Sequence, residues 1–252
     1  MAAPDGPQRR QPAGWNGSVE GARAAGGALN GVREALAVWA AIIVALAALE
    51  LIGQFLPFVH GLVGAAAVAA FLYVPLRMLE RRGQDAHDAG WRFDRLPRDL
   101  AWSLGACAVV LPLFGAGFVL FARWFAHLPP QMQHWIAPYA RFRGFHLDLA
   151  MSWELAGQVA GNAAVAFSEE FFYRGYMTLR FEERWGPVRT AVTAAALFAV
   201  GHLLTPAPWR LAVFFPALLF AWLRNRTGTI VGASIAHFLC NVWLLLLERS
   251  AF

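Results

Sequence analysis

The chain has 252 residues, 58% of them hydrophobic and 11 of them tryptophan. This composition excludes an ordinary soluble domain, in which about half of the residues are apolar, and predicts an integral membrane protein. The formal net charge of +5 does not indicate nucleic acid, because the arginines fall in the gaps between apolar runs. Arginines in such gaps set membrane topology and face anionic lipid. We therefore expect membrane lipid as a partner and no nucleic acid.

Residues 1–33 contain Gly, Ala, Pro, Gln and scattered Arg without an apolar run, which predicts a flexible cytoplasmic tail. Residues 34–252 are expected to form a single transmembrane domain. It contains seven apolar runs, each near the roughly 20 residues that a membrane-spanning helix needs. They cover about 34–54, 58–79, 100–123, 156–180, 188–204, 209–224 and 229–248. The predicted fold is all-α, a polytopic transmembrane helix bundle of about seven spans.

Arginines crowd the tail and the even-numbered gaps, which predicts a cytoplasmic N-terminus. The aromatic-rich segment 125–152 is then expected on the outer face, as an interfacial helix or a partial lid. All 21 basic residues are arginine, and this bias together with the alanine content favours a GC-rich bacterial genome and a bacterial inner membrane. Cys107 and Cys240 lie within apolar runs and are expected to be buried free thiols.

Glu169, Glu170 and Arg174 lie well inside the fourth run, where burial of charge is costly and usually functional. Glu170 and Arg174 are four residues apart with the carboxylate first, the favourable order for an ion pair on a helix. This pair neutralises Glu170 and leaves Glu169 available for chemistry.

The fifth run places Phe198 and His202 on one helix face, and the seventh does the same for His237 and Asn241. Glu169 and His202 are expected at the same depth, because the turn near Trp185–Pro187 falls almost midway between them. The spacing therefore predicts an active site between the fourth, fifth and seventh helices.

A carboxylate and an imidazole at hydrogen-bonding range can deprotonate a water, which suits Glu169 and His202. A second imidazole and an amide can stabilise the oxyanion that forms when water attacks a peptide carbonyl, which suits His237 and Asn241. No Ser or Cys stands in an obvious nucleophile motif. The set predicts peptide hydrolysis by activated water, without a covalent intermediate, and no cofactor is expected.

These residues resemble the CAAX-protease and bacteriocin-processing (CPBP, or Abi) intramembrane proteases, which include the CAAX prenyl endopeptidases. The motif E-E-x-x-x-R corresponds to Glu169, Glu170 and Arg174; F-x-x-x-H and H-x-x-x-N follow as Phe198 with His202 and His237 with Asn241. The likeness covers about 153–247. It implies a glutamate-dependent endopeptidase in which Glu169 and His202 activate water, His237 and Asn241 form the oxyanion hole, and Glu170 and Arg174 support them.

Two other interpretations stay open. Glu169, His202 and His237 are also the two-histidine, one-carboxylate set of a catalytic zinc site, although no H-E-x-x-H is present. The chain could instead be a non-catalytic membrane immunity or binding factor. For a protease, the expected substrate is a membrane-associated or exported protein or peptide precursor with a hydrophobic or membrane-anchored segment.

Overall fold

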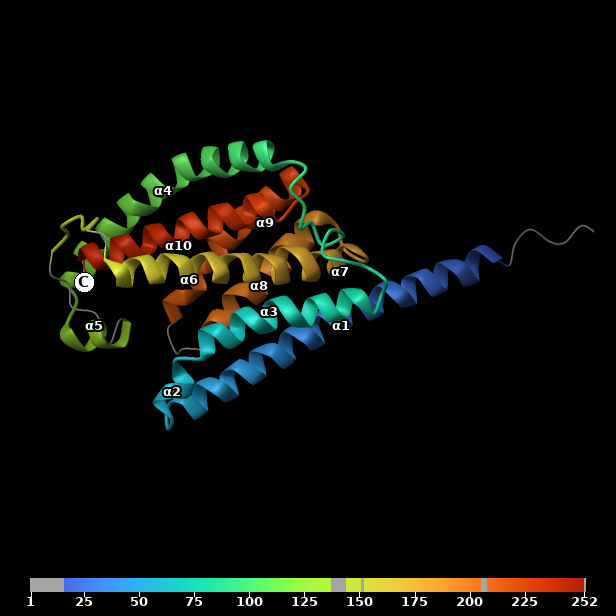
Figure 1. Ribbon diagram of the computed structural model, residues 1–252, viewed down its shortest axis with the longest axis horizontal. Coiled ribbons are helices and arrows are strands. Elements are labelled where there is room, and N and C mark those ends of the chain that lie inside the picture. Colours follow the sequence, from blue (N-terminus) through green and yellow to red (C-terminus); the bar gives the residue numbers. More distant parts are fainter. Residues whose placement is uncertain (1–15, 137–143, 151, 205–207, 252) are drawn as a thin grey trace, which may run out of the picture.

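A computed structural model of the protein describes residues 16–136, 144–150, 152–204 and 208–251, and this part of the chain contains helices and no strand (Figure 1). The all-α prediction is confirmed. The helices are α1 (Asn16–Gly53), α2 (Pro57–His60), α3 (Val63–Glu80), α4 (Leu96–Ala126), α5 (Pro130–Ile136), α6 (Trp153–Glu170), η1 (Phe171–Met177), α7 (Thr178–Glu182), α8 (Pro187–Gly201), η2 (His202–Leu204), η3 (Pro208–Val213), α9 (Phe214–Thr227) and α10 (Val231–Ala251).

The helices run back and forth between two ends of the bundle (Figure 1). The arginine-rich end holds the α3–α4, α7–α8 and α9–α10 connections. There Arg82 bonds to Glu34 of α1 at 2.9 Å, and Arg95 donates to the Thr227 carbonyl at 3.0 Å. The opposite end holds α2, α5 and the C-terminus of α10, where the His146 amide donates to the Ser250 carbonyl at 2.8 Å. This path matches the alternation expected of a polytopic bundle.

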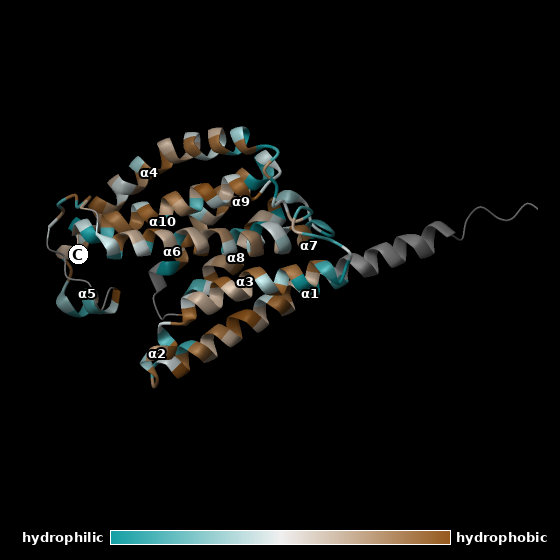
Figure 2. Cartoon of the chain, viewed as in Figure 1, coloured by the Kyte–Doolittle hydropathy of each residue, from teal (hydrophilic) through white to brown (hydrophobic). Residues whose placement is uncertain are grey.

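Five helices of the described part are long and apolar enough to cross a membrane: Asn30–Gly53, Val63–Glu80, Leu96–Ala126, Pro187–Leu204 and Val231–Ala251. Hydrophobic residues predominate along the bundle in Figure 2, whereas the α3–α4 connection is largely hydrophilic. The protein is therefore an integral membrane protein. The two remaining runs are helical too, but one is divided by η1 and α9 has only 14 residues. The count of seven spans stays a prediction.

Two segments differ in detail from the sequence prediction. Helix α1 begins at Asn16, inside the segment 1–33 for which no helix was expected, while 1–15 lie outside the described residues. The segment 125–152 contains the short helix α5, and its residues 144–150 run along the end of α10, where Arg249 pairs with Asp148 at 2.9 Å. Residues 137–143 and 151 are not described, so the roles of lid and interfacial helix stay predictions.

At the centre of the fold lies η1, a π-helix that continues α6 without a break. All seven of its residues, Phe171–Met177, are buried. Helices α1, α3, α8 and α9 pack around it. A helix that is buried on every side needs no polar face, which explains the run of aromatic residues here. The π-helical turn was not predicted from the sequence, and such turns often occur at functional sites.

Candidate active site

Glu170 is the centre of a buried polar cluster. Its Oε1 accepts from Arg174 Nη1 at 3.0 Å, so the predicted ion pair is present, and both side chains are fully buried. The same oxygen lies 2.8 Å from His237 Nδ1. This second contact joins α6 to α10 and was not expected from the sequence. It makes Glu170 a partner of one proposed catalytic histidine as well as of Arg174.

Arg174 is held on several sides. Its guanidinium carbon lies 4.7 Å from the ring centre of Phe198 and 5.4 Å from that of Phe220, and Nη2 donates to the Ala217 carbonyl at 2.9 Å. Contacts of a cation with aromatic faces and with a carboxylate compensate part of the cost of burying it. Arg174 thus connects η1 to α8 and α9 and fixes the carboxyl group of Glu170.

His237 lies between the two adjacent carboxylates. Its Nε2 is 3.5 Å from Glu169 Oε2, while its Nδ1 contacts Glu170. The imidazole stacks on the ring of Phe220 with centres 4.6 Å apart, which keeps it in this plane. Glu169 is 14% exposed, whereas Glu170 is fully buried, so Glu169 is the carboxylate that water and substrate can reach.

His202 follows α8 as the first residue of η2. Its Nδ1 lies 2.9 Å from the Phe198 carbonyl, and the two rings are 4.5 Å apart, as the four-residue spacing predicted. A carbonyl only accepts, so Nδ1 carries the proton of this hydrogen bond. In the neutral ring Nε2 is then a hydrogen-bond acceptor, available to a water or a substrate group.

Glu169 and His202 line one cavity of about 260 Å³. Its walls are mostly apolar and come from α1, α3, α6, η1, the end of α8, η2 and η3. Toward the opposite end of the bundle it reaches Glu50 and Arg210, and its lining also includes Glu169 and Tyr173. The apolar lining includes Ile43, Leu46, Val63, Ala67, Val68 and Phe71.

Asn241 follows His237 by one turn of α10 and is partly exposed. Among the residues that the structure describes, no hydrogen bond reaches its side chain. Its place in the candidate site rests on this position alone, whereas contacts join Glu169, Glu170, Arg174, Phe198, His202 and His237 directly or through a shared neighbour.

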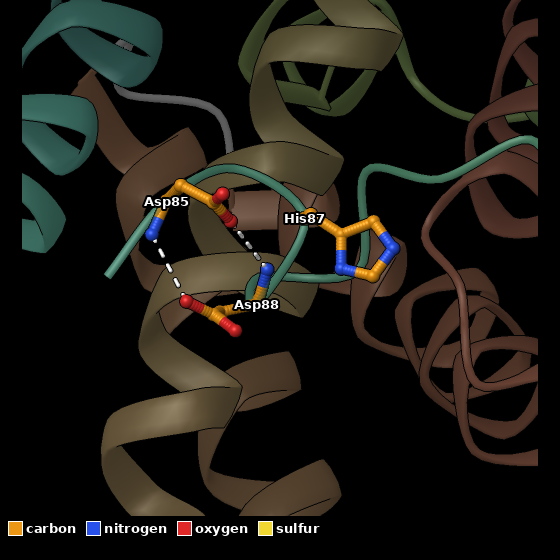
Figure 3. Close-up of side chains that lie close together, drawn as sticks. All are labelled: Asp85, His87 and Asp88. Carbon is orange, nitrogen blue, oxygen red and sulfur yellow. Dashed lines mark hydrogen bonds between the residues drawn. The ribbon is translucent and has the colours of Figure 1, made fainter. Parts of the chain in front are cut away.

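The zinc alternative can be tested against the same geometry. Within the described part of the chain, Glu169, His202 and His237 do not bring three ligand atoms within 4.8 Å of one another; the group that does is Asp85, His87 and Asp88. That group is exposed in the α3–α4 connection, and Figure 3 shows each aspartate accepting from the backbone amide of the other. These two bonds shape the turn in which the group lies.

The fold and the cluster define an integral membrane protein with a buried carboxylate–imidazole centre. Residues 151–243 match the family model "Type II CAAX prenyl endopeptidase Rce1-like". This part of the chain is an Rce1-like domain of the CPBP family, which confirms the resemblance seen in the motifs. At a coarse level, this match supports an intramembrane CAAX-type protease with a lipid environment and a protein or peptide substrate. No curated protein and no solved structure matches the chain.

Proposed function

We propose that the protein is a glutamate-dependent intramembrane endopeptidase. The observation that carries this proposal is that Glu169 and His202 line one largely apolar cavity inside the helix bundle. A carboxylate and an imidazole in such a cavity are suited to activate a water against a peptide bond.

In this mechanism Glu169 accepts the proton of the attacking water, and His202 Nε2 positions that water. The partial exposure of Glu169 supports its role as the base, because Glu170 is occupied by Arg174 and His237. The attack forms a tetrahedral intermediate, and Glu169 then returns the proton to the departing amine.

His237 and Asn241 are the proposed donors to the oxyanion. If His237 Nε2 donates to the substrate while Nδ1 donates to Glu170, the ring carries both protons and a positive charge. Glu169, Glu170 and Arg174 then complete a cluster of two negative and two positive groups. Donors held in place before the reaction stabilise the developing negative charge without reorganising, which is a large part of catalysis in hydrolases.

The walls of the cavity indicate the kind of substrate. Leu46, Val68 and Phe71 present apolar surface from α1 and α3, so we infer that a hydrophobic or membrane-anchored segment of a protein or peptide precursor occupies it. We place this reaction in a bacterial inner membrane, on an exported precursor.

The test compares membranes of the native cell that contain the wild type, Glu169→Gln or Glu154→Gln at equal levels. Glu154 is an exposed carboxylate on the same helix and serves as the matched control. Quantitative proteomics of new peptide termini is expected to show a set that appears with the wild type and with Glu154→Gln and is absent with Glu169→Gln. Such termini would also identify the substrate.

Equal termini in all three samples would contradict the assignment of Glu169 as the base. If no sample shows new termini while Glu169→Gln retains the biological effect of the wild type, the non-catalytic binding role is the correct one. Loss of cleavage on treatment of the purified protein with a chelator, restored by Zn²⁺, would instead support a zinc protease.

A further inference from the structure

Tyr173 belongs to the central π-helix and has no role in the mechanism above. We propose that its hydroxyl group is a further catalytic group, which donates a hydrogen bond to the oxyanion of the tetrahedral intermediate. This inference rests on the proposed function. It is supported by the place of Tyr173 in the cavity, by the direction of its hydrogen bonds and by the space left for its hydroxyl.

Tyr173 lines the same cavity as Glu169 and His202. It follows Glu169 by four residues, and in a π-helix, as in an α-helix, this spacing puts two side chains on the same face. The ring is only 2% exposed and packs edge-on against Phe198, with centres 5.1 Å apart and planes at 86°. The phenol is therefore fixed in orientation in a cavity that two of the proposed catalytic residues, Glu169 and His202, also line.

The Tyr173 hydroxyl oxygen already accepts one hydrogen bond. Trp39 Nε1 of α1 lies 3.2 Å from Tyr173 Oη, and the indole N–H can only donate. The Tyr173 oxygen is thus the acceptor, and its own proton must bond elsewhere. In the described part of the chain this proton has no acceptor. A buried hydroxyl with an unused proton, beside a cavity, is placed to donate to a ligand in that cavity.

Gly201 makes room for the hydroxyl. A Cβ atom built on Gly201 would lie 3.0 Å from Tyr173 Oη and 3.3 Å from Ile43 Cδ1, closer than most Cβ contacts in proteins. An alanine directly before His202 would therefore require the hydroxyl group or the Ile43 side chain to shift by a few tenths of an ångström. Gly201 thus leaves the space that the hydroxyl occupies at the edge of the cavity.

Tyr176 provides an internal comparison. It lies in the same π-helix and is also buried, but its hydroxyl donates to Glu34 Oε1 at 2.9 Å, and the residue does not line the cavity. Tyr176 shows what is expected of a hydroxyl with a purely structural role: its proton is donated to another residue of the protein. Tyr173 differs because its proton remains for a ligand.

The experiment measures kcat and KM of purified protein in detergent on a synthetic peptide that spans a cleavage site found with the wild type. Tyr173→Phe is expected to lower kcat about a hundredfold with KM little changed, as for the loss of one oxyanion donor. Tyr176→Phe, the matched control, is expected to keep the wild-type kcat although it loses a buried hydrogen bond.

Trp39→Phe tests whether Trp39 acts through Tyr173. It is expected to lower kcat by a smaller factor, because the hydroxyl is then free to rotate, and the double variant with Tyr173→Phe should be no slower than Tyr173→Phe alone. Gly201→Ala should reproduce part of the kcat loss, since it displaces the hydroxyl.

Two outcomes would overturn this inference while leaving the proposed function intact. One is a wild-type kcat for Tyr173→Phe when Glu169→Gln is inactive. The other is a loss of kcat in Tyr173→Phe that Tyr176→Phe shares and that follows the melting temperature, which would mark a structural hydroxyl. If Glu169→Gln itself cleaves the peptide, the proposed function fails and the role of Tyr173 fails with it.

Discussion

At the scale of single residues, the two adjacent glutamates have different environments. Glu170 is enclosed by Arg174 and His237, whereas Glu169 faces the cavity. Adjacent residues on a helix point about 100° apart, so one carboxylate can serve the scaffold while its neighbour serves the substrate. Glu170 Oε2 and Arg174 Nε are buried without a hydrogen-bond partner among the described residues. The stability of the cluster is therefore sensitive to the loss of any further hydrogen bond.

Glu170→Ala is therefore expected to destabilise the fold by about 3–5 kcal/mol, the usual cost of leaving one member of a buried ion pair alone. Glu170→Gln retains an oxygen acceptor and the volume of the side chain and should cost less. Thermal unfolding in micelles measures both, with Glu80→Ala, which breaks the exposed Arg77–Glu80 pair, as the control without effect. A melting temperature of Glu170→Ala equal to that of the control would contradict this account.

At the scale of helices, the sequence predicted contacts within one helix better than contacts between helices. Four-residue spacings predicted the Glu170–Arg174 pair and the Phe198–His202 contact, because neighbours on one helix are set by its period. The contact of Glu170 with His237 depends on how α6 and α10 are rotated against each other, which a period does not reveal. Tyr173 could have been found, since it shares the spacing from Glu169 that identified other residues.

The position of α10, which carries His237, depends on contacts near the α9–α10 turn. The Thr229 hydroxyl donates to Asp99 Oδ1 of α4 at 2.8 Å, and Ser103 Oγ donates to the Gly232 carbonyl at 2.7 Å. Arginines at this end donate to the last two carbonyls of α9 and to that of Gly228 just after it, a capping role beyond the topological one expected from the sequence. Asp99 is fully buried, and its Oδ2 has no partner among the described residues.

Thr229→Val should therefore lower the free energy of unfolding by about 1–3 kcal/mol, because it removes the donor to a buried carboxyl group without changing the side-chain volume much. Thr229→Ser keeps the hydroxyl and should stay close to the wild type. Denaturation in mixed micelles measures the difference between the two variants. Equal stability would show that water, and not Thr229, satisfies Asp99.

At the scale of the whole molecule, most of the positive charge lies at one end of the bundle, and the cavity extends toward the other end. Most arginines of the described part gather at the arginine-rich end, whereas the other end holds few. The arginines at the arginine-rich end are Arg33, Arg77, Arg81, Arg82, Arg92, Arg95, Arg98, Arg180, Arg184, Arg189, Arg224 and Arg226. Those at the opposite end are Arg123, Arg210 and Arg249. The cavity extends toward the opposite end, because Glu50 lies near the end of α1 and Val63 begins α3. Positive residues near helix ends stay in the cytoplasm. Substrate would then enter from the outer side of the membrane.

This orientation predicts which single cysteines a membrane-impermeant maleimide can reach in intact cells. In a variant with Cys107 and Cys240 replaced by alanine, Gln54→Cys, which is exposed between α1 and α2, should be labelled without permeabilisation. Arg81→Cys, exposed after α3, should be labelled only once the membrane is opened. The reverse pattern would put the cavity on the cytoplasmic side and direct the search toward cytoplasmic substrates. Because the cavity geometry is the same in either orientation, that result would change the source of the substrate and leave the chemistry of Glu169 and His202 as proposed.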